Sequence, residues 1–107
     1  MNLNTRNYPP TSGIRVPAAE MKTLLARLFA AVDMSSSDAE ILANILTIND
    51  RRCLFSHGMG QVPYYLQKIK DGLVNPRPDI AVVREAPGAL VMDGDGGLGY
   101  FPCYEGT

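Results

Sequence analysis

The sequence has few residues that commonly bind metals. It contains one histidine, His57, and two cysteines, Cys53 and Cys103, which are far apart along the chain. A zinc site needs three or four suitably spaced ligands, so we expect no such site here. We also predict that both cysteines remain reduced thiols, as is usual in the cytoplasm.

The sequence also lacks an excess of one charge and any long apolar run. Ten Lys+Arg balance eleven Asp+Glu, for a net charge of −1, which does not favour nucleic acid or anionic membranes as partners. The apolar run from Leu28 to Val32 is too short to span a bilayer, and the polar N-terminus MNLNTRNYPPTSG lacks the apolar core of a signal peptide. We therefore expect a soluble, cytoplasmic protein with no membrane partner.

The first half of the chain shows helical periodicity. Residues 1–13 are predicted to form a disordered tail, and Pro17 suits the start of a helix over residues 18–32. Ser35 with Asp38, or Ser37 with Glu40, resembles the capping pattern of a second helix that ends near Arg51. Apolar positions recur at intervals of three and four in the first helix, and one face of the second combines Leu42, Ile45, Leu46 and Asn49.

A third helix and a β-hairpin are predicted to follow. Proline is tolerated only in a first turn, so Pro63 places the start of the helix between Met59 and Val62, and Gly72 suits its end. Short apolar runs at 80–83 and 89–92 flank Ala86-Pro87-Gly88 and predict a hairpin. The last ten residues, 98–107, show no clear period.

These elements predict an α+β chain with a helical region at 14–78 and the start of an α/β domain at 79–107. A hairpin with an apolar face needs a covering layer, and the remaining residues offer none that the pattern reveals. We therefore expect a truncated domain, either a fragment of a larger fold or a chain completed by a partner.

The segment GDGGLG at 94–99 formally matches the glycine pattern of dinucleotide-binding loops. Such a loop must open a helix, and we do not expect the following Gly-Tyr-Phe-Pro to start one. The segment also lacks the later ligands of a calcium loop. We predict a structural turn.

His57 has two interpretations from its surroundings in LFSHGMGQVPYY. Ser56 and His57 could simply cap the third helix, or the imidazole could exchange protons with a ligand near neutral pH. A nucleophile activated by His57 is not favoured. The sequence gives no evident place for a carboxylate or amide that would orient a Cys53–His57 pair, and adjacent residues such as Ser56 seldom aim their side chains at each other.

Several motifs together resemble one enzyme family. They are Ser56-His57-Gly58 with Pro63 and Tyr65, then Gly72, Asn75-Pro76, and the segment VMDGDGGLG at 91–99. The stretch from Val16 to Gly99 is similar to the N-terminal part of the malate/L-lactate dehydrogenase family, which includes ureidoglycolate dehydrogenases and diketogulonate reductases. The resemblance implies a larger, non-Rossmann α/β dehydrogenase fold.

The resemblance also implies an activity and a site. Members oxidise a small 2-hydroxy acid, or reduce the 2-oxo acid, with NAD or NADP, and they are usually homodimers. His57 matches the family histidine that exchanges a proton with the substrate, and Ser56 matches its neighbour in the substrate pocket. Gln61 stands where many members carry an Arg that grips the substrate carboxylate, and Cys53 stands where many carry a glycine.

Family chains are much longer than this one, and their cofactor-binding residues lie beyond the part that is matched. We therefore expect an N-terminal fragment that is inactive alone, with no cofactor-binding residue of its own. The alternative is a small non-catalytic module whose helical hairpin offers an apolar face to a partner.

Overall fold

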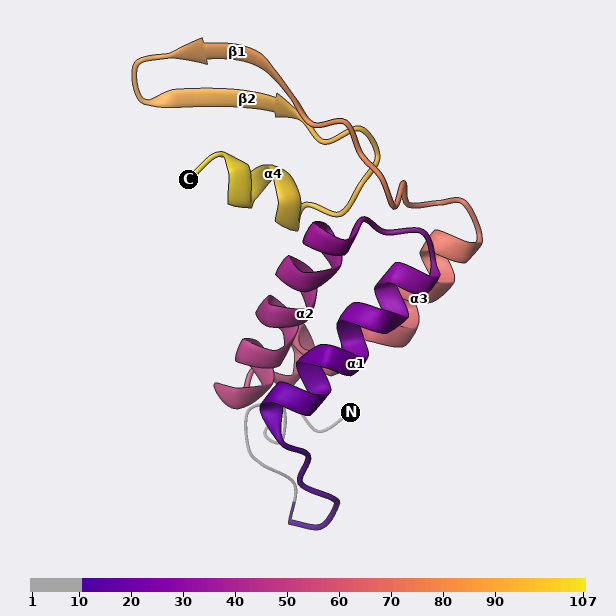
Figure 1. Cartoon of the computed structure of the whole chain (residues 1–107). Coiled ribbons are helices and arrows are strands. Elements are labelled where there is room, and N and C mark those ends of the chain that lie inside the picture. The colour runs from indigo at the N-terminus through magenta and orange to yellow at the C-terminus, as the bar shows by residue number, and fades with distance from the viewer. Residues whose placement is uncertain (1–10) are drawn as a thin grey trace.

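The computed structural model describes residues 11–107, so most of the predicted tail at 1–13 lies outside the described residues. The elements in chain order are α1 (Ala18–Ala31), α2 (Ser36–Arg51), the 3₁₀ turns η2 (Phe55–His57) and η3 (Met59–Gln61), α3 (Val62–Lys70), β1 (Ala81–Ala86), β2 (Ala89–Asp93) and α4 (Tyr100–Glu105). The helices α1, α2 and α3 lie together, the β1–β2 hairpin projects from them, and α4 lies between the two parts (Figure 1). This arrangement confirms the predicted α+β class, in which a helical region precedes a hairpin.

The core lies where α1 and α2 pack against each other as an antiparallel pair. Leu25 and Phe29 of α1 meet Leu42 and Leu46 of α2, and all four side chains are at most 1% exposed. The apolar stripe predicted for the first helix is wider than the buried face, because Leu24 and Leu28 remain exposed. Burial of the central leucines and the phenylalanine is the main force that holds the helical pair together.

The three longer helices end in the same backbone motif. The amides of Met34, Leu54 and Leu73 donate to the carbonyls of Phe29, Asn49 and Lys68, which is the bond that defines a Schellman end. The residue before each of these amides has a positive φ: 73° at Asp33, 60° at Cys53 and 73° at Gly72. Only the third is a glycine, so two helix ends hold a strained L-residue.

The start of α2 also follows the predicted pattern. The Ser35 hydroxyl accepts a hydrogen bond of 3.2 Å from the Asp38 amide. The bond satisfies one of the amide groups that have no partner within the helix. Ser35 is therefore the N-cap, and the first of the two capping patterns is confirmed.

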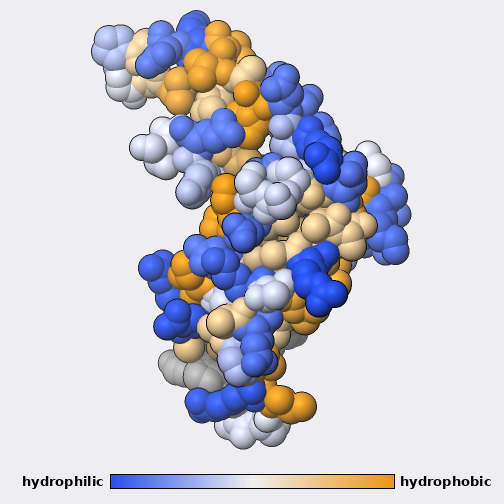
Figure 2. All heavy atoms as spheres, in the orientation of Figure 1, coloured by the Kyte–Doolittle hydropathy of each residue, from blue (hydrophilic) through white to orange (hydrophobic). Residues whose placement is uncertain are grey.

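The hairpin forms as predicted around Pro87 and Gly88, whose φ is 75°. Pairing runs from Ala86↔Ala89 to Ala81↔Asp93, with a register shift between Val82 and Arg84. Its apolar side chains Val82, Val83, Leu90 and Val91 are 42–66% exposed, and orange surface is visible over the hairpin in Figure 2. The apolar hairpin is therefore only partly covered by residues 11–107.

Helix α4 corrects the prediction for the C-terminal residues, where no helix was expected after Gly99. Pro102 lies in the first turn, where a missing N–H costs nothing, so the proline does not prevent the helix. The decisive contact is tertiary, because Phe101 is buried to 2% exposure in the core. The end of α4 lies close to Leu90 and Met92 of β2, so α4 partly fills the space beneath the hairpin.

Candidate active site around His57

His57 lies in η2, in the connection between α2 and α3. The His57 amide donates to the Leu54 carbonyl over 2.9 Å, which closes the 3₁₀ turn. The Ser56 hydroxyl lies 2.8 Å from Nδ1 of the imidazole, and the histidine side chain is exposed. Because Nδ1 is engaged by Ser56, Nε2 is the ring nitrogen directed away from this bond.

One expectation about this pair was wrong, and one of the two interpretations of His57 is excluded. Adjacent residues were not expected to aim at each other, but Oγ and Nδ1 both lie close to the backbone, so the tight turn brings them into contact. Neither residue caps the third helix: η3 intervenes, and the N-cap of α3 is Gln61, which makes no side-chain capping bond. Pro63 in the first turn of α3 removes one amide that would need a partner.

Gly58 lies directly after the histidine and is buried against the end of α2. A Cβ built at Gly58 would lie 2.7 Å from Cγ of Asp50 and 3.2 Å from its backbone nitrogen. The Asp50 carboxylate thus occupies the space of a side chain, and it accepts a 3.2 Å hydrogen bond from the Met59 amide. Burial raises the pKa of Asp50, and the Met59 bond opposes that rise.

Two side-chain amides hold the carbonyl groups of the Ser56–His57 pair. Nε2 of Gln61 donates to the Ser56 carbonyl over 2.6 Å, and Nδ2 of Asn49 donates to the His57 carbonyl over 2.9 Å. The structure therefore brings Ser56, His57 and Gln61 together in one loop. The sequence did not reveal that Asn49 and Asp50 belong to the site; its only sign was that Asn49 interrupts an otherwise apolar helix face.

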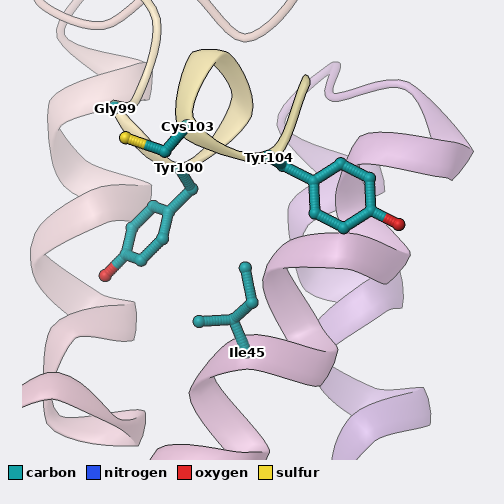
Figure 3. Close-up of a pocket in the computed structure, with 5 residues that line it drawn as sticks. All are labelled: Ile45, Gly99, Tyr100, Cys103 and Tyr104. Atoms are coloured by element: carbon teal, nitrogen blue, oxygen red, sulfur yellow. The ribbon is translucent and has the colours of Figure 1, made fainter. Parts of the chain in front are cut away.

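A separate hollow lies between α2 and α4. It has a volume of about 540 Å³ and is lined by Ile45, Gly99, Tyr100, Cys103 and Tyr104 (Figure 3). His57 is not among the lining residues. The hollow therefore lies apart from the Ser56–His57 pair.

Tyr65 of α3 and Tyr100 of α4 link the helical region to the C-terminal helix. Their hydroxyl oxygens are 2.9 Å apart, and their rings meet edge-on. Burial raises the pKa of Tyr65 well above its ordinary value, and the hydrogen bond between Tyr65 and Tyr100 adds to the rise. Tyr65 therefore makes a structural contact that joins α3 to α4.

The segment GDGGLG forms the turn that the sequence predicted, and this turn is packed. The Asp95 carboxylate accepts hydrogen bonds from the Asp79 amide and the Asn75 side chain. A Cβ at Gly97 would lie 2.7 Å from Pro78, so this glycine is needed for close packing rather than for an open cradle. Among residues 11–107, no group of three or more His, Cys, Asp or Glu is placed to hold a metal ion.

The sequence is similar to those of known dehydrogenases. The malate/L-lactate dehydrogenase family profile matches residues 16–107, and the chain belongs to this family. The chain is 38% identical to the L-sulfolactate dehydrogenase of Methanocaldococcus jannaschii over 78 residues, which cover 73% of this chain and 23% of that enzyme. It is 35% identical to the malate dehydrogenase of Pyrococcus horikoshii over 99 residues, which cover 92% of this chain and 28% of that enzyme.

Solved structures show the same fold. The Pyrococcus horikoshii malate dehydrogenase superposes with a TM-score of 0.84 over 92% of this chain and 28% of that one, at 35% identity. A dehydrogenase from Sinorhizobium meliloti superposes with a TM-score of 0.80 over 87% of this chain and 27% of that one, at 28% identity. The chain thus spans about a quarter of the length of the relatives it matches. No helix of residues 11–107 is long and apolar enough to cross a membrane.

Proposed function

We propose that this chain is the N-terminal segment of an NAD(P)-dependent 2-hydroxy-acid dehydrogenase and supplies the residue that exchanges a proton with the substrate. We further propose that the segment is inactive alone. The observation that carries the proposal is the exposed His57 imidazole, held at Nδ1 by Ser56 in a chain that belongs to a dehydrogenase family. Relatives are named as malate and L-sulfolactate dehydrogenases, whose substrates are small 2-hydroxy acids.

The proposed role of His57 follows from the chemistry of alcohol oxidation. The carbon of a CH–OH group loses a hydride while its hydroxyl loses a proton, and a base must accept that proton. An imidazole with Nδ1–H donating to the Ser56 hydroxyl leaves Nε2 as the basic atom. Protonation of Nε2 keeps the Ser56 bond intact, and the reverse step returns the proton to the carbonyl oxygen of a 2-oxo acid.

Ser56 and Gln61 are proposed to line the substrate pocket. Gln61 carries no charge, and its Nε2 donates to the Ser56 carbonyl. A substrate carboxylate at this position would therefore be held by hydrogen bonds and not by an ion pair. We expect any positively charged residue that pairs with the substrate carboxylate to lie outside this chain.

A nicotinamide cofactor, NAD or NADP, would accept the hydride in such an enzyme. The glycine turn at 94–99 does not provide a fitting cradle for it, because the turn is closed by Asn75 and Pro78 and is followed by the short α4. We infer that the cofactor site belongs to the remainder of a longer enzyme, which we expect to be a cytoplasmic homodimer.

The proposal can be tested with a chimera. Residues 16–107 would replace the matched segment of the Pyrococcus horikoshii malate dehydrogenase, and malate-dependent reduction of NAD or NADP would be followed. We expect activity in the chimera, none in the isolated chain, and a loss on the order of 100-fold or more in His57→Asn. Lys70→Gln, on an exposed face of α3, is the matched control. A His57→Asn chimera within threefold of the parent chimera would contradict the proposal.

A further inference from the structure

Asn49 is a polar residue on the helix face that otherwise carries Leu42, Ile45 and Leu46. It lies in the last turn of α2 and is half-buried. Its backbone carbonyl accepts the Leu54 amide over 2.8 Å, and its side-chain Nδ2 donates to the His57 carbonyl over 2.9 Å. One residue therefore fixes both ends of the segment that carries the histidine.

The His57 side chain contributes little to holding this segment, because it is exposed. The order of the loop comes instead from α2, through Asn49 and through the Asp50 carboxylate that accepts the Met59 amide. Gln61 holds the neighbouring Ser56 carbonyl. The backbone on both sides of the Ser56–His57 contact is thus anchored.

We propose that Asn49 is a positioning residue for His57. By holding the His57 carbonyl, it keeps Nδ1 within hydrogen-bond distance of Ser56 and directs Nε2 outward, where a substrate hydroxyl can reach it. Asn49 touches no reacting atom and acts through the backbone of His57. The consequence for catalysis rests on the proposed function, while the effect on the imidazole does not.

The lone histidine makes the test direct, because the isolated chain gives one set of imidazole nitrogen signals by NMR. Asn49→Leu keeps the shape of the side chain and removes the donor, and Asn49→Ala is the second variant if the first fails to fold. Asn75→Leu is the matched control, since Asn75 also donates to a backbone carbonyl, that of Asp95, far from His57 in the sequence. We expect Asn49→Leu to change the Nδ1 signal toward that of Ser56→Ala, and Asn75→Leu to leave it unchanged.

Two results would overturn the proposal. One is an Nδ1 signal in the folded Asn49 variants that equals that of the parent chain. The other is an equal change in Asn49→Leu and Asn75→Leu, which would indicate general loosening. In the chimera we expect kcat to fall about threefold to tenfold with KM within twofold, the factor that one net hydrogen bond supplies. An inactive parent chimera, or an active His57→Asn chimera, would refute the proposed function and leave the NMR comparison intact as a test of positioning.

Discussion

Gly58 offers the sharpest test of the packing behind the His57 loop. In Gly58→Ala, the new methyl group would enter the space of the Asp50 carboxylate, whose Cγ lies 2.7 Å from the ideal Cβ position. Overpacking of this kind costs about 1–3 kcal/mol, and displacing the carboxylate from the Met59 amide costs about 1 kcal/mol more. We expect the free energy of unfolding to fall by about 2–4 kcal/mol, measured by urea denaturation.

A double-mutant cycle identifies the cause. With Asp50→Ala as the background, the side-chain clash is removed and only the tight approach to the Asp50 backbone nitrogen, at 3.2 Å, remains. The cost of Gly58→Ala should then drop to about 1 kcal/mol or less. Gly99→Ala is the matched control, because nothing lies within 4 Å of its Cβ position and the exchange should be neutral or slightly stabilising. An equal cost of Gly58→Ala in both backgrounds would refute this reasoning.

Asp50, Cys53 and the Tyr65–Tyr100 pair allow three further tests. The pKa of Asp50 in the folded protein is raised above 3.8, so the protonated carboxyl stabilises the fold below that pH, and this stabilisation is lost as pH rises through the folded pKa. The free energy of unfolding of Asp50→Asn relative to the parent chain should therefore increase from acid toward neutral pH. A constant difference in denaturation experiments would contradict this. Cys53→Gly should be more stable than Cys53→Ala by about 1 kcal/mol, since glycine adopts a φ of 60° without strain; equal unfolding midpoints would be evidence against it. Tyr100→Phe should lower the pKa of Tyr65 toward 10 without reaching it, because burial is the larger cause. An unchanged Tyr65 titration, followed by NMR of its ring, would show that the hydroxyl contact is unimportant.

The helices and the hairpin could be predicted because their signals are local. The apolar spacing of α1 and α2, the Ser35 cap and the glycine after α3 act within a turn or two of helix. The hairpin likewise follows from two apolar runs around Pro87 and Gly88. Helix α4 could not be predicted, since it is short, contains Pro102 and depends on burial of Phe101 in a core made by distant residues.

The candidate site was likewise predicted only in part. Sequence motifs singled out Ser56, His57 and Gln61, and the family match extends through Thr107. The contacts of Asn49 and Asp50 with this loop could not be predicted, because they depend on where the end of α2 meets the turn. A helical pattern predicts which residues share a face, but it does not predict which polar side chain reaches the carbonyl of a residue in another element.

The sequence by itself determined the helical periodicities, the turn positions and the motif that marks the family, because these depend on neighbours within a few residues. Only the tertiary structure decided that Asn49 holds the His57 carbonyl and that Gly58 must lack a side chain. It also decided that α4 forms against the core. These features require groups from separate elements to meet at specific distances, and such meetings are set by how the helices pack.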